Sequence, residues 1–262
     1  MLIKNATKDK LKKDQLVMGF RMEFASSLLV EALGDAGFDF VFIDCEHRNG
    51  MSDQDVENMI RVAEMVNLTP IIRVPSNDHA IIANYLEQGA MGIIAPHCIN
   101  KEVTESLVSA VKYPPQGGRG MGGRAFSQRN MPVGDYVREA NQETMAIALI
   151  EDAEGVDNLS EIVSVDGIDL IIVGQYDLSS SMGYPGELDH PEVRAAVEKI
   201  INMTRAAGKA VAVGPAPVQD PEKLKRLLDM GLRYIDIGLT ELIKGAARDI
   251  IQKVHAVYDK GK

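Results

Sequence analysis

Short apolar runs recur along the chain, and each is preceded by a glycine that follows a helix-like segment. Four clear copies of this unit cover residues 35–44, 87–96, 165–174 and 229–238. A glycine directly after a helix adopts the left-handed conformation that closes the last turn, and the apolar run then enters a sheet. Runs of four or more apolar residues are typical of strands buried on both faces, as in a parallel sheet flanked by helices.

Between these runs lie amphipathic segments with apolar residues three and four positions apart, for example Val56, Met59, Ile60 and Ala63. The expected strands are residues 16–20, 38–43, 70–74, 91–95, 145–150, 170–173, 210–213 and 234–237. Eight strands that alternate with helices in a chain of 262 residues favour a (β/α)₈ TIM barrel over an open doubly wound sheet. We therefore expect one α/β domain over residues 1–262, with a polar arm or short helix at residues 4–13 before the first strand.

The connection between the fourth and fifth strands is unusually long. It contains Gly118-Arg119-Gly120-Met-Gly-Gly123, which matches G-x-G-x-x-G by letter. Because no strand precedes this motif and no helix opens cleanly after it, a dinucleotide site is not expected. Loops of this length are usually functional, so residues at about 112–135 are predicted to form a lid-like loop that carries Arg119 over the barrel mouth.

Composition and net charge indicate which kinds of molecule the protein binds. Apolar residues make up 45% of the chain and charged residues 25%, and the mean hydropathy is −0.07, which indicates a globular protein with an ample core. The net charge of −10 and pI near 5.0 argue against nucleic acid or an anionic membrane, and favour a small-molecule ligand. Two cysteines, no secretory signal and no long apolar run fit a reducing cytoplasm without a disulfide.

Polar residues follow several predicted strands, at the edge where α/β barrels carry their active sites. Glu151 and Asp177 follow the fifth and sixth strands. Two carboxylates suit Mg²⁺ or Mn²⁺, and a 2-oxo acid can complete the coordination through its carboxylate and keto oxygens. The alternative is that each acid caps a helix or pairs with an arginine. The other polar residues at this edge are Asp44, Glu46, His47, Arg73, His97, Cys98 and Asp152.

Arg73 and His47 are the candidates for binding an anion and moving a proton. A guanidinium matches a carboxylate or a developing enolate oxygen, although Arg73 can equally form a structural ion pair with Asp44 or Glu46. His47 follows Asp44 by three residues, and a neighbouring carboxylate can fix the tautomer of an imidazole and raise its basicity. A single histidine near a loop is nevertheless more often structural than catalytic. Cys98 shows no sequence sign of an activating base.

A set of motifs that runs from about residue 17 to residue 249 resembles the HpcH/HpaI aldolase family of class II, metal-dependent pyruvate aldolases, which includes the 2-dehydro-3-deoxyglucarate aldolases. The motifs are Phe42-Ile-Asp44-Cys-Glu46-His47, Ile72-Arg73-Val-Pro75, Lys112-Tyr-Pro-Pro115 with Gly118-Arg-Gly120, Ile150-Glu151, Val173-Gly174-Gln-Tyr176-Asp177-Leu-Ser179 and Met182-Gly-Tyr184. Their order and spacing make the resemblance specific.

The resemblance implies a (β/α)₈ barrel of the phosphoenolpyruvate/pyruvate type. Its last helix would be exchanged between subunits of a trimer or hexamer. It also implies an aldolase that cleaves a 4-hydroxy-2-oxo acid to pyruvate and an aldehyde through a metal-stabilised enolate. Glu151 and Asp177 would hold Mg²⁺, Mn²⁺ or Co²⁺, with no organic cofactor, and His47, backed by Asp44, would be the acid/base group. The residues expected to contact substrate are Arg73, Gly174, Tyr176 and Arg119.

Several positions depart from the family pattern. Leu149 replaces a frequent glutamine, Gln175-Tyr176 replaces Pro-Ala, and Cys45 replaces a glycine or asparagine. Because Tyr176 is large beside a keto acid, the pocket is expected to differ in size or polarity. Two alternatives stay open: a related enzyme that decarboxylates or condenses oxaloacetate, as citrate synthases and macrophomate synthases of this fold do, and a keto-acid-binding protein without turnover.

Overall fold

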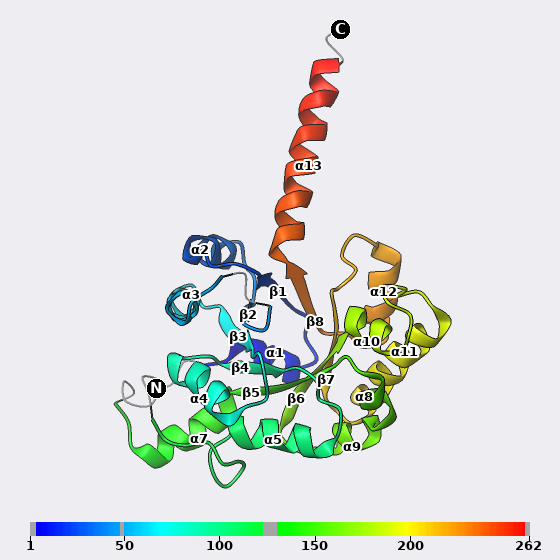
Figure 1. Cartoon of the computed structure of the whole chain (residues 1–262). Helices are drawn as coiled ribbons and strands as arrows, with labels where there is room; N and C mark the ends of the chain where they lie inside the picture. The colour runs from blue at the N-terminus through cyan, green and yellow to red at the C-terminus, as the bar shows by residue number, and fades with distance from the viewer. Residues whose placement is uncertain (1–3, 48–49, 123–129, 260–262) are drawn as a thin grey trace.

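A closed parallel barrel of eight strands forms the centre of the molecule (Figure 1). The computed structural model describes residues 4–47, 50–122 and 130–259. The strands are β1 (Val17–Met22), β2 (Phe40–Asp44), β3 (Thr69–Arg73), β4 (Gly92–Ala95), β5 (Met145–Ile150), β6 (Ile168–Gly174), β7 (Ala210–Gly214) and β8 (Tyr234–Gly238). They pair in sequence order, and β8 closes on β1. The predicted TIM barrel and its eight strands are confirmed, although β1 reaches Met22 and so includes Arg21.

Most of the helices surround the barrel on the outside (Figure 1). They are α1 (Ala6–Lys12), α2 (Ser27–Asp35), α3 (Asp53–Met65), α4 (His79–Gln88), α5 (Lys101–Val111), α7 (Val133–Glu143), α8 (Ala153–Asp157), α9 (Leu159–Ser164), α10 (Gln175–Ser181), α11 (Pro191–Ala206), α12 (Pro221–Asp229) and α13 (Leu239–Tyr258). The glycines expected after helices have φ between 74° and 118°, the left-handed region. They are Gly37, Gly89, Gly167, Gly208 and Gly231.

Apolar side chains fill two separate layers. Inside the barrel the strands contribute a column that includes Phe40 and Tyr234, whose rings stack at 4.1 Å between centroids. A larger layer lies between the strands and the outer helices and includes the stripe that was predicted for α3. This column fills the barrel interior on the side of the amino ends of the strands. Polar side chains lie at the carboxyl ends of the strands.

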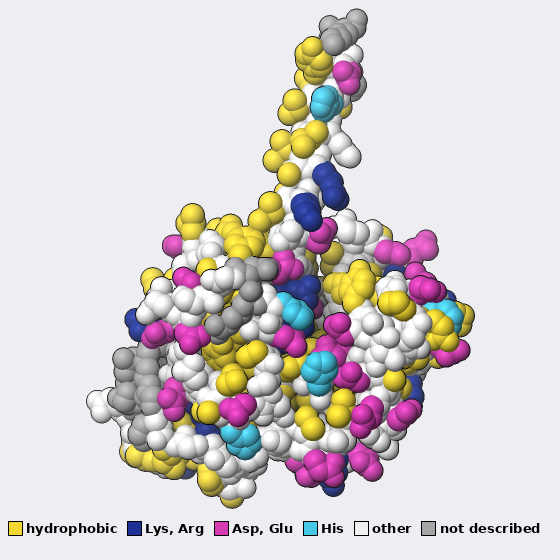
Figure 2. Space-filling model, in the orientation of Figure 1, with side chains coloured by type: hydrophobic (Ala, Val, Ile, Leu, Met, Phe, Trp, Pro, Cys, Tyr) yellow, Lys and Arg dark blue, Asp and Glu magenta, His cyan; other side chains and the backbone are white. Residues whose placement is uncertain are grey.

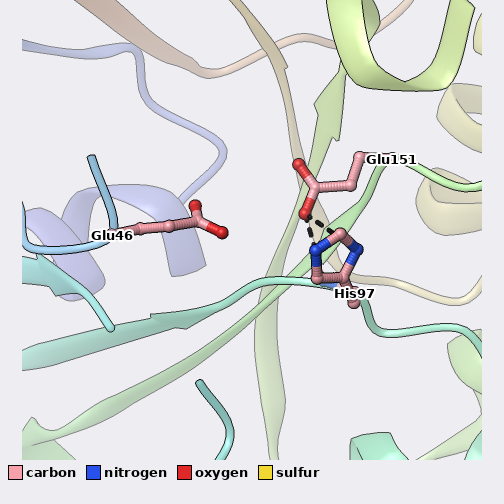
Figure 3. A group of neighbouring side chains, drawn as sticks. All are labelled: Glu46, His97 and Glu151. Atoms are coloured by element: carbon pink, nitrogen blue, oxygen red, sulfur yellow. Dashed lines mark hydrogen bonds and ion pairs between the residues drawn. The ribbon is translucent and has the colours of Figure 1, made fainter. Parts of the chain in front are cut away.

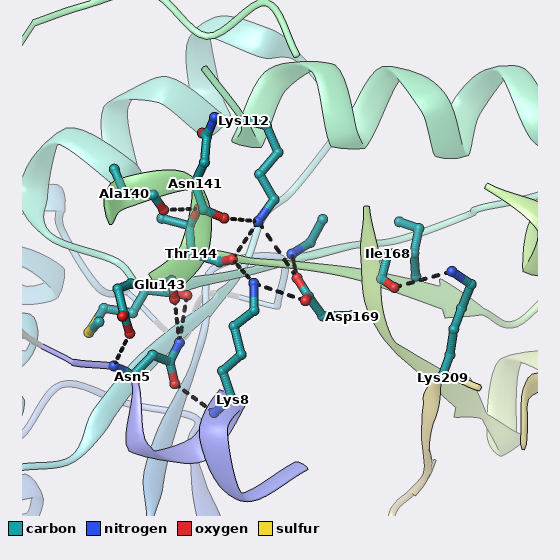
Figure 4. Close-up of polar contacts among 12 residues, drawn as sticks. Asn5, Lys8, Lys112, Ala140, Asn141, Glu143, Thr144, Ile168, Asp169 and Lys209 are labelled. Atoms are coloured by element: carbon teal, nitrogen blue, oxygen red, sulfur yellow. Dashed lines mark hydrogen bonds and ion pairs between the residues drawn. The ribbon is translucent and has the colours of Figure 1, made fainter. Parts of the chain in front are cut away.

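Helix α1 covers the amino ends of the strands and closes the bottom of the barrel (Figure 4). The Asn5 side chain donates to the carbonyl oxygens of Met91 and Glu143, at 3.2 and 2.8 Å. Lys8 Nζ donates to the Thr144 carbonyl at 2.6 Å and forms an ion pair with Asp169 at 2.9 Å. The segment at residues 4–13, predicted to be a polar arm or a short helix, is therefore a helix with a structural role.

The loop that starts at Lys112 also lies at the amino end of the barrel. Lys112 Nζ donates to the carbonyl oxygens of Asn141 and Thr144, directly before β5, at 2.9 and 2.6 Å. The Arg119 backbone N–H bonds the Lys112 carbonyl, and its guanidinium carbon lies 4.5 Å from the Tyr113 ring centroid. Residues 123–129 of the expected lid lie outside the described residues. The described part of this loop therefore lies far from the barrel mouth, and the lid stays a prediction.

The last helix, α13, projects away from the barrel (Figure 1). Within the described parts of the chain, no helix is long and apolar enough to cross a membrane. Six large apolar side chains of α13 are nevertheless exposed: Ile243, Ile250, Ile251, Val254, Val257 and Tyr258.

Candidate active site

A cavity of about 300 Å³, lined by charged and apolar side chains, opens at the carboxyl ends of the strands. Acidic, basic and histidine side chains gather around the hollow below α13 (Figure 2). The predicted site residues that line the cavity are Asp44, His47, Arg73, Glu151, Gly174, Tyr176 and Asp177. The barrel therefore brings together side chains from β2, β3, β5 and β6 that are separated by more than a hundred positions in the chain.

Asp44 and Arg73 form a buried ion pair. They occupy partnered positions on β2 and β3, and the guanidinium meets the carboxylate through two hydrogen bonds of 3.0 and 2.5 Å. Glu46 Oε2 lies 3.1 Å from the same Arg73 Nε that donates to Asp44 Oδ1. Burial raises the pKa of Asp44, but the hydrogen bond and charge of Arg73 outweigh it and hold that pKa below its usual value. The structural ion pair considered for Arg73 is thus present, and it fixes the guanidinium at the cavity wall.

His47 lies at the rim of the cavity with its side chain 68% exposed. Its backbone N–H donates to Asp44 Oδ1 at 3.2 Å, whereas its ring Nε2 lies 3.9 Å from Glu46 Oε2. The expected support from Asp44 therefore comes through the backbone, because both oxygens of that carboxylate are engaged by Arg73. Glu46 is the acid nearest the imidazole among the described residues.

Glu151 lies in a cluster of negative charge. The residue is 3% exposed, and its pKa is raised to about 7 by burial, with further contributions from the charges of Glu46 and Asp177. Ligand atoms of Glu46, His97 and Glu151 lie within 4.8 Å of one another, and Figure 3 shows them on facing loops. This group is a second possible ligand set, and it shares Glu151 with the pair of Glu151 and Asp177 that the sequence predicts.

His97 supports Glu151 from the neighbouring strand. Its φ of 52° places it in the left-handed region, and its backbone N–H donates to Glu151 Oε1 at 3.1 Å. The ring Nδ1 lies 2.9 Å from Asp152 Oδ2, and this hydrogen bond raises the pKa of His97. Burial raises the pKa of the Cys98 thiol to about 12, so a thiolate is not available at neutral pH.

The carboxylates fit a hard divalent cation. Buried carboxylates that repel one another are costly unless a cation neutralises them, and oxygen donors are those that Mg²⁺ and Mn²⁺ prefer. Gly174 leaves the space that this arrangement needs, because a Cβ there would meet Glu151 Oε2 at 3.0 Å and Leu149 Cδ1 at 3.3 Å. A larger residue at this position would displace the Glu151 side chain.

Arg119 is not among the residues that line the cavity. Its guanidinium packs on Tyr113 at the amino end of the barrel, where burial lowers its pKa. The expected contact of Arg119 with substrate in its own barrel thus has no support in the described contacts, because the strands separate the two ends.

Three charged residues of the cavity were not predicted: Arg21, Glu23 and Asp236. Arg21 is the second-last residue of β1 and lies beyond the predicted end of that strand. Asp236 is 2% exposed on β8, and burial raises its pKa while the charge of Arg21 opposes the increase. The available sequence signal was the charge in the run Tyr-Ile-Asp-Ile-Gly, since an acid inside a buried strand is rarely neutral to function.

The fold and the cavity define a class, the (β/α)₈-barrel enzymes whose acidic, basic and histidine side chains meet at the carboxyl end of the strands. The family model for HpcH/HpaI aldolase/citrate lyase matches residues 18–242. The chain belongs to this family, and is therefore an enzyme of the aldolase type, a carbon–carbon lyase.

Individual relatives agree with this assignment. A 4-hydroxy-2-oxo-heptane-1,7-dioate aldolase of Salmonella dublin is 37% identical over 248 residues, which cover 93% of this chain and 92% of the relative. The structure of an HpcH/HpaI aldolase from Desulfitobacterium hafniense has a TM-score of 0.86 at 26% identity, covering 94% and 95% of the two chains. The citrate synthase SbnG has a TM-score of 0.84 at 30% identity, covering 95% and 97%.

Proposed function

We propose that the protein is a divalent-metal-dependent aldolase that cleaves a 4-hydroxy-2-oxo acid to pyruvate and an aldehyde. The observation that carries the proposal is that Arg73 and Glu151 line one cavity, with Arg73 bonded to the Asp44 carboxylate and Glu151 to the His97 backbone N–H. An arginine and a carboxylate-held cation together match the carboxylate and keto oxygens of a 2-oxo acid. The similarity to the Salmonella dublin aldolase supports the same reaction class.

We assign the metal to Glu151 and Asp177, with Mg²⁺, Mn²⁺ or Co²⁺ as the candidates. A cation bound there would act as a Lewis acid toward the 2-oxo group. Asp177 lines the same cavity as Glu151, and its charge contributes to the raised pKa of Glu151.

Arg73 supplies the fixed positive charge of the reaction. When the bond between C3 and C4 breaks, its electron pair moves toward the C2 oxygen, and a guanidinium aimed at that oxygen stabilises the resulting enolate. Asp44 and Glu46 hold the guanidinium in place before substrate arrives, so little reorganisation is needed during the reaction. Tyr176, which is exposed at the rim, and Gly174 complete the wall that the substrate contacts.

His47 is the proposed acid/base group. In the cleavage direction it takes the proton of the C4 hydroxyl, the aldehyde leaves, and C3 of the enolate is protonated to give pyruvate. The exposed ring can reach both the substrate and solvent, and its Nε2 lies 3.9 Å from Glu46 Oε2.

We propose that α13 packs on a second subunit in a trimer or hexamer, as an exchanged helix. Its projecting position and its exposed apolar side chains support this assembly, since a helix with an uncovered apolar face buries that face against another surface. Cys45 and Cys98 are both buried and form no disulfide, which supports placement in a reducing cytoplasm.

The experiment that tests the proposal is aldol formation from pyruvate and a panel of aldehydes, with Mg²⁺ or Mn²⁺ and then with EDTA. The proposal predicts a 4-hydroxy-2-oxo acid that forms only with the metal. Absence of product across the panel would contradict it and would favour a keto-acid-binding protein without turnover.

A further inference from the structure

The wall of the cavity opposite Glu151 carries a second polar group. Arg21 lies on β1 and Asp236 on β8, in adjacent strands whose register pairs Gly19 with Asp236 and Arg21 with Gly238. In a closed barrel of eight strands, β1 lies across from β5, which ends at Ile150, directly before Glu151. Both side chains line the same cavity as Arg73 and the carboxylates. A ligand bound between Arg73 and Glu151 therefore extends toward Arg21 and Asp236.

Among the described residues, long ion pairs rather than hydrogen bonds join these two side chains to each other and to Glu23. Arg21 Nη1 lies 3.7 Å from Asp236 Oδ2, and Arg21 Nε lies 3.8 Å from Glu23 Oε1, distances too long for hydrogen bonds. Asp236 is 2% exposed, and its Oδ2 is buried without a hydrogen-bond partner. The pair thus presents donors beside an unpaired acceptor at the cavity wall.

The distance between Arg21 Nη1 and Asp236 Oδ2 indicates which kind of ligand group can bind both atoms. A hydroxyl can accept a hydrogen bond from Arg21 and donate its own proton to Asp236 Oδ2 at the same time. A carboxylate cannot donate, and it would face the charges of Glu23 and Asp236. An alkyl group would leave the buried acceptor unpaired, which disfavours its binding.

We propose that Arg21 and Asp236 recognise a hydroxyl group on the aldehyde half of the substrate, so that the enzyme prefers hydroxyaldehydes to alkyl aldehydes and to aldehydes that carry a carboxylate. This inference rests on the proposed aldolase function and adds a substrate class to it. Arg73 and the carboxylates hold the 2-oxo acid, and the β1–β8 wall holds the partner.

A purely structural role for Asp236 makes a different prediction. The Tyr234 hydroxyl, two residues earlier on the same strand, is also buried without a hydrogen-bond partner, so the two groups could share a buried water that only stabilises the barrel. Loss of such a water would affect all aldehydes equally. Loss of a hydroxyl subsite would affect hydroxylated aldehydes selectively.

The test compares glycolaldehyde, acetaldehyde and succinate semialdehyde as partners of pyruvate with Mg²⁺. Glycolaldehyde and acetaldehyde differ by one hydroxyl, and the ratio of their kcat/KM values is the readout. The wild type should favour glycolaldehyde, and Asp236→Ala and Arg21→Met should each lower this ratio by on the order of tenfold. Asp229→Ala and Arg138→Met, exposed residues paired with Lys225 and Asp135, are the matched controls and should leave the ratio unchanged.

Each outcome decides the matter. The proposal would be overturned if the kcat/KM ratio is unchanged in both cavity variants, whether activity is kept or is lost equally with both aldehydes. A wild-type preference for succinate semialdehyde that Arg21→Met removes would also overturn it, since that result indicates an anion subsite. If Asp236→Ala does not fold, Asp236→Asn takes its place, because it preserves the shape of the side chain. The proposal is then overturned if the kcat/KM ratio is unchanged in both Asp236→Asn and Arg21→Met. A wild type that makes product without preferring glycolaldehyde contradicts the subsite alone, whereas one that makes no product contradicts the proposed aldolase.

Discussion

Asp44 holds Arg73 through two hydrogen bonds because the two residues are direct partners across β2 and β3. The register of a parallel sheet thus fixes the position of the guanidinium at the cavity wall. Both side chains are buried, at 4% and 8% exposure, so the pair is weakly screened by solvent. A substitution of Arg73 that keeps the positive charge would still remove the two-bond geometry of this pair.

Arg73→Lys should therefore impair catalysis although the charge is kept. A lysine cannot bond both Asp44 and a substrate oxygen in the same fixed orientation, so kcat/KM should fall on the order of a hundredfold. Coupled detection of pyruvate release measures the change. Arg61→Lys, in an exposed pair with Glu57, is the matched control and should retain activity. A fully active Arg73→Lys enzyme would show that the fork geometry is not required.

Substitution of the proposed metal ligands should abolish cation binding. Glu151→Gln and Asp177→Asn each remove one charged oxygen ligand, and Mn²⁺ bound per chain, measured by electron paramagnetic resonance, should drop to background. Asp152→Asn is the neighbouring control and should bind one Mn²⁺, because this residue pairs with His97 instead.

His97→Ala separates the two possible ligand sets. If Glu151 and Asp177 hold the cation, Mn²⁺ stoichiometry should be unchanged in His97→Ala, since the backbone N–H that donates to Glu151 is kept and the ring lies 3.7 Å from Oε1 without being a ligand. Loss of Mn²⁺ from this variant, with retention in Asp177→Asn, would assign the site to the group of Glu46, His97 and Glu151 instead.

The buried Lys112 at the amino end of the barrel should make the free energy of unfolding depend on pH. Lys112 is 3% exposed, and burial lowers its pKa to about 7, with Lys8 adding to the effect (Figure 4). Between pH 7 and the unfolded pKa of 10.5, the unfolded chain binds more protons at this residue than the folded chain, so stability rises with pH in that window. Below pH 7 the cost of the buried charge is fully present.

Lys112→Met provides the reference for this effect. Urea unfolding at pH 7 and pH 9 should show that wild type gains stability over the variant as pH rises, by up to about 1.4 kcal/mol per pH unit. At any pH the variant leaves the Asn141 and Thr144 carbonyls with one donor fewer, a cost of about 1–3 kcal/mol. A stability difference that is constant with pH would show that Lys112 stays charged in the fold.

Helix α13 should control the oligomeric state. Ile250→Asp places a charge on its exposed apolar face and should shift the assembly toward monomer in light scattering coupled to gel filtration. Gln252→Asp adds the same charge on the opposite face of the same helix and should leave the assembly unchanged. An intact oligomer in Ile250→Asp would argue that this face is not the interface.

Much of the fold follows from local signals in the sequence. Glycines after helices and buried apolar runs located all eight strands, because those signals act within a few residues. Strand order then placed Arg73, Glu151 and Asp177 around one cavity, since a parallel barrel gathers its carboxyl ends.

What the sequence did not reveal depends on side-chain direction and strand length. Arg21 was missed because β1 continues two residues past its last predicted position, and Asp236 because an inward-facing acid looks like any residue in a strand. The contact of Asp44 with the His47 backbone, instead of its ring, reflects competition from Arg73, which spacing along the chain does not show. Arg119 was expected at the mouth, but its described loop packs near Lys112 at the other end.

The central claim is that the cavity stabilises the enolate of pyruvate, and exchange of the pyruvate methyl protons in D₂O tests it most directly. No aldehyde is needed, so the result does not depend on the identity of the second substrate. We predict that NMR will show exchange that requires Mg²⁺ or Mn²⁺, stops with EDTA and is lost in Glu151→Gln. Pyruvate binding without metal-dependent exchange in the wild-type protein would contradict the account.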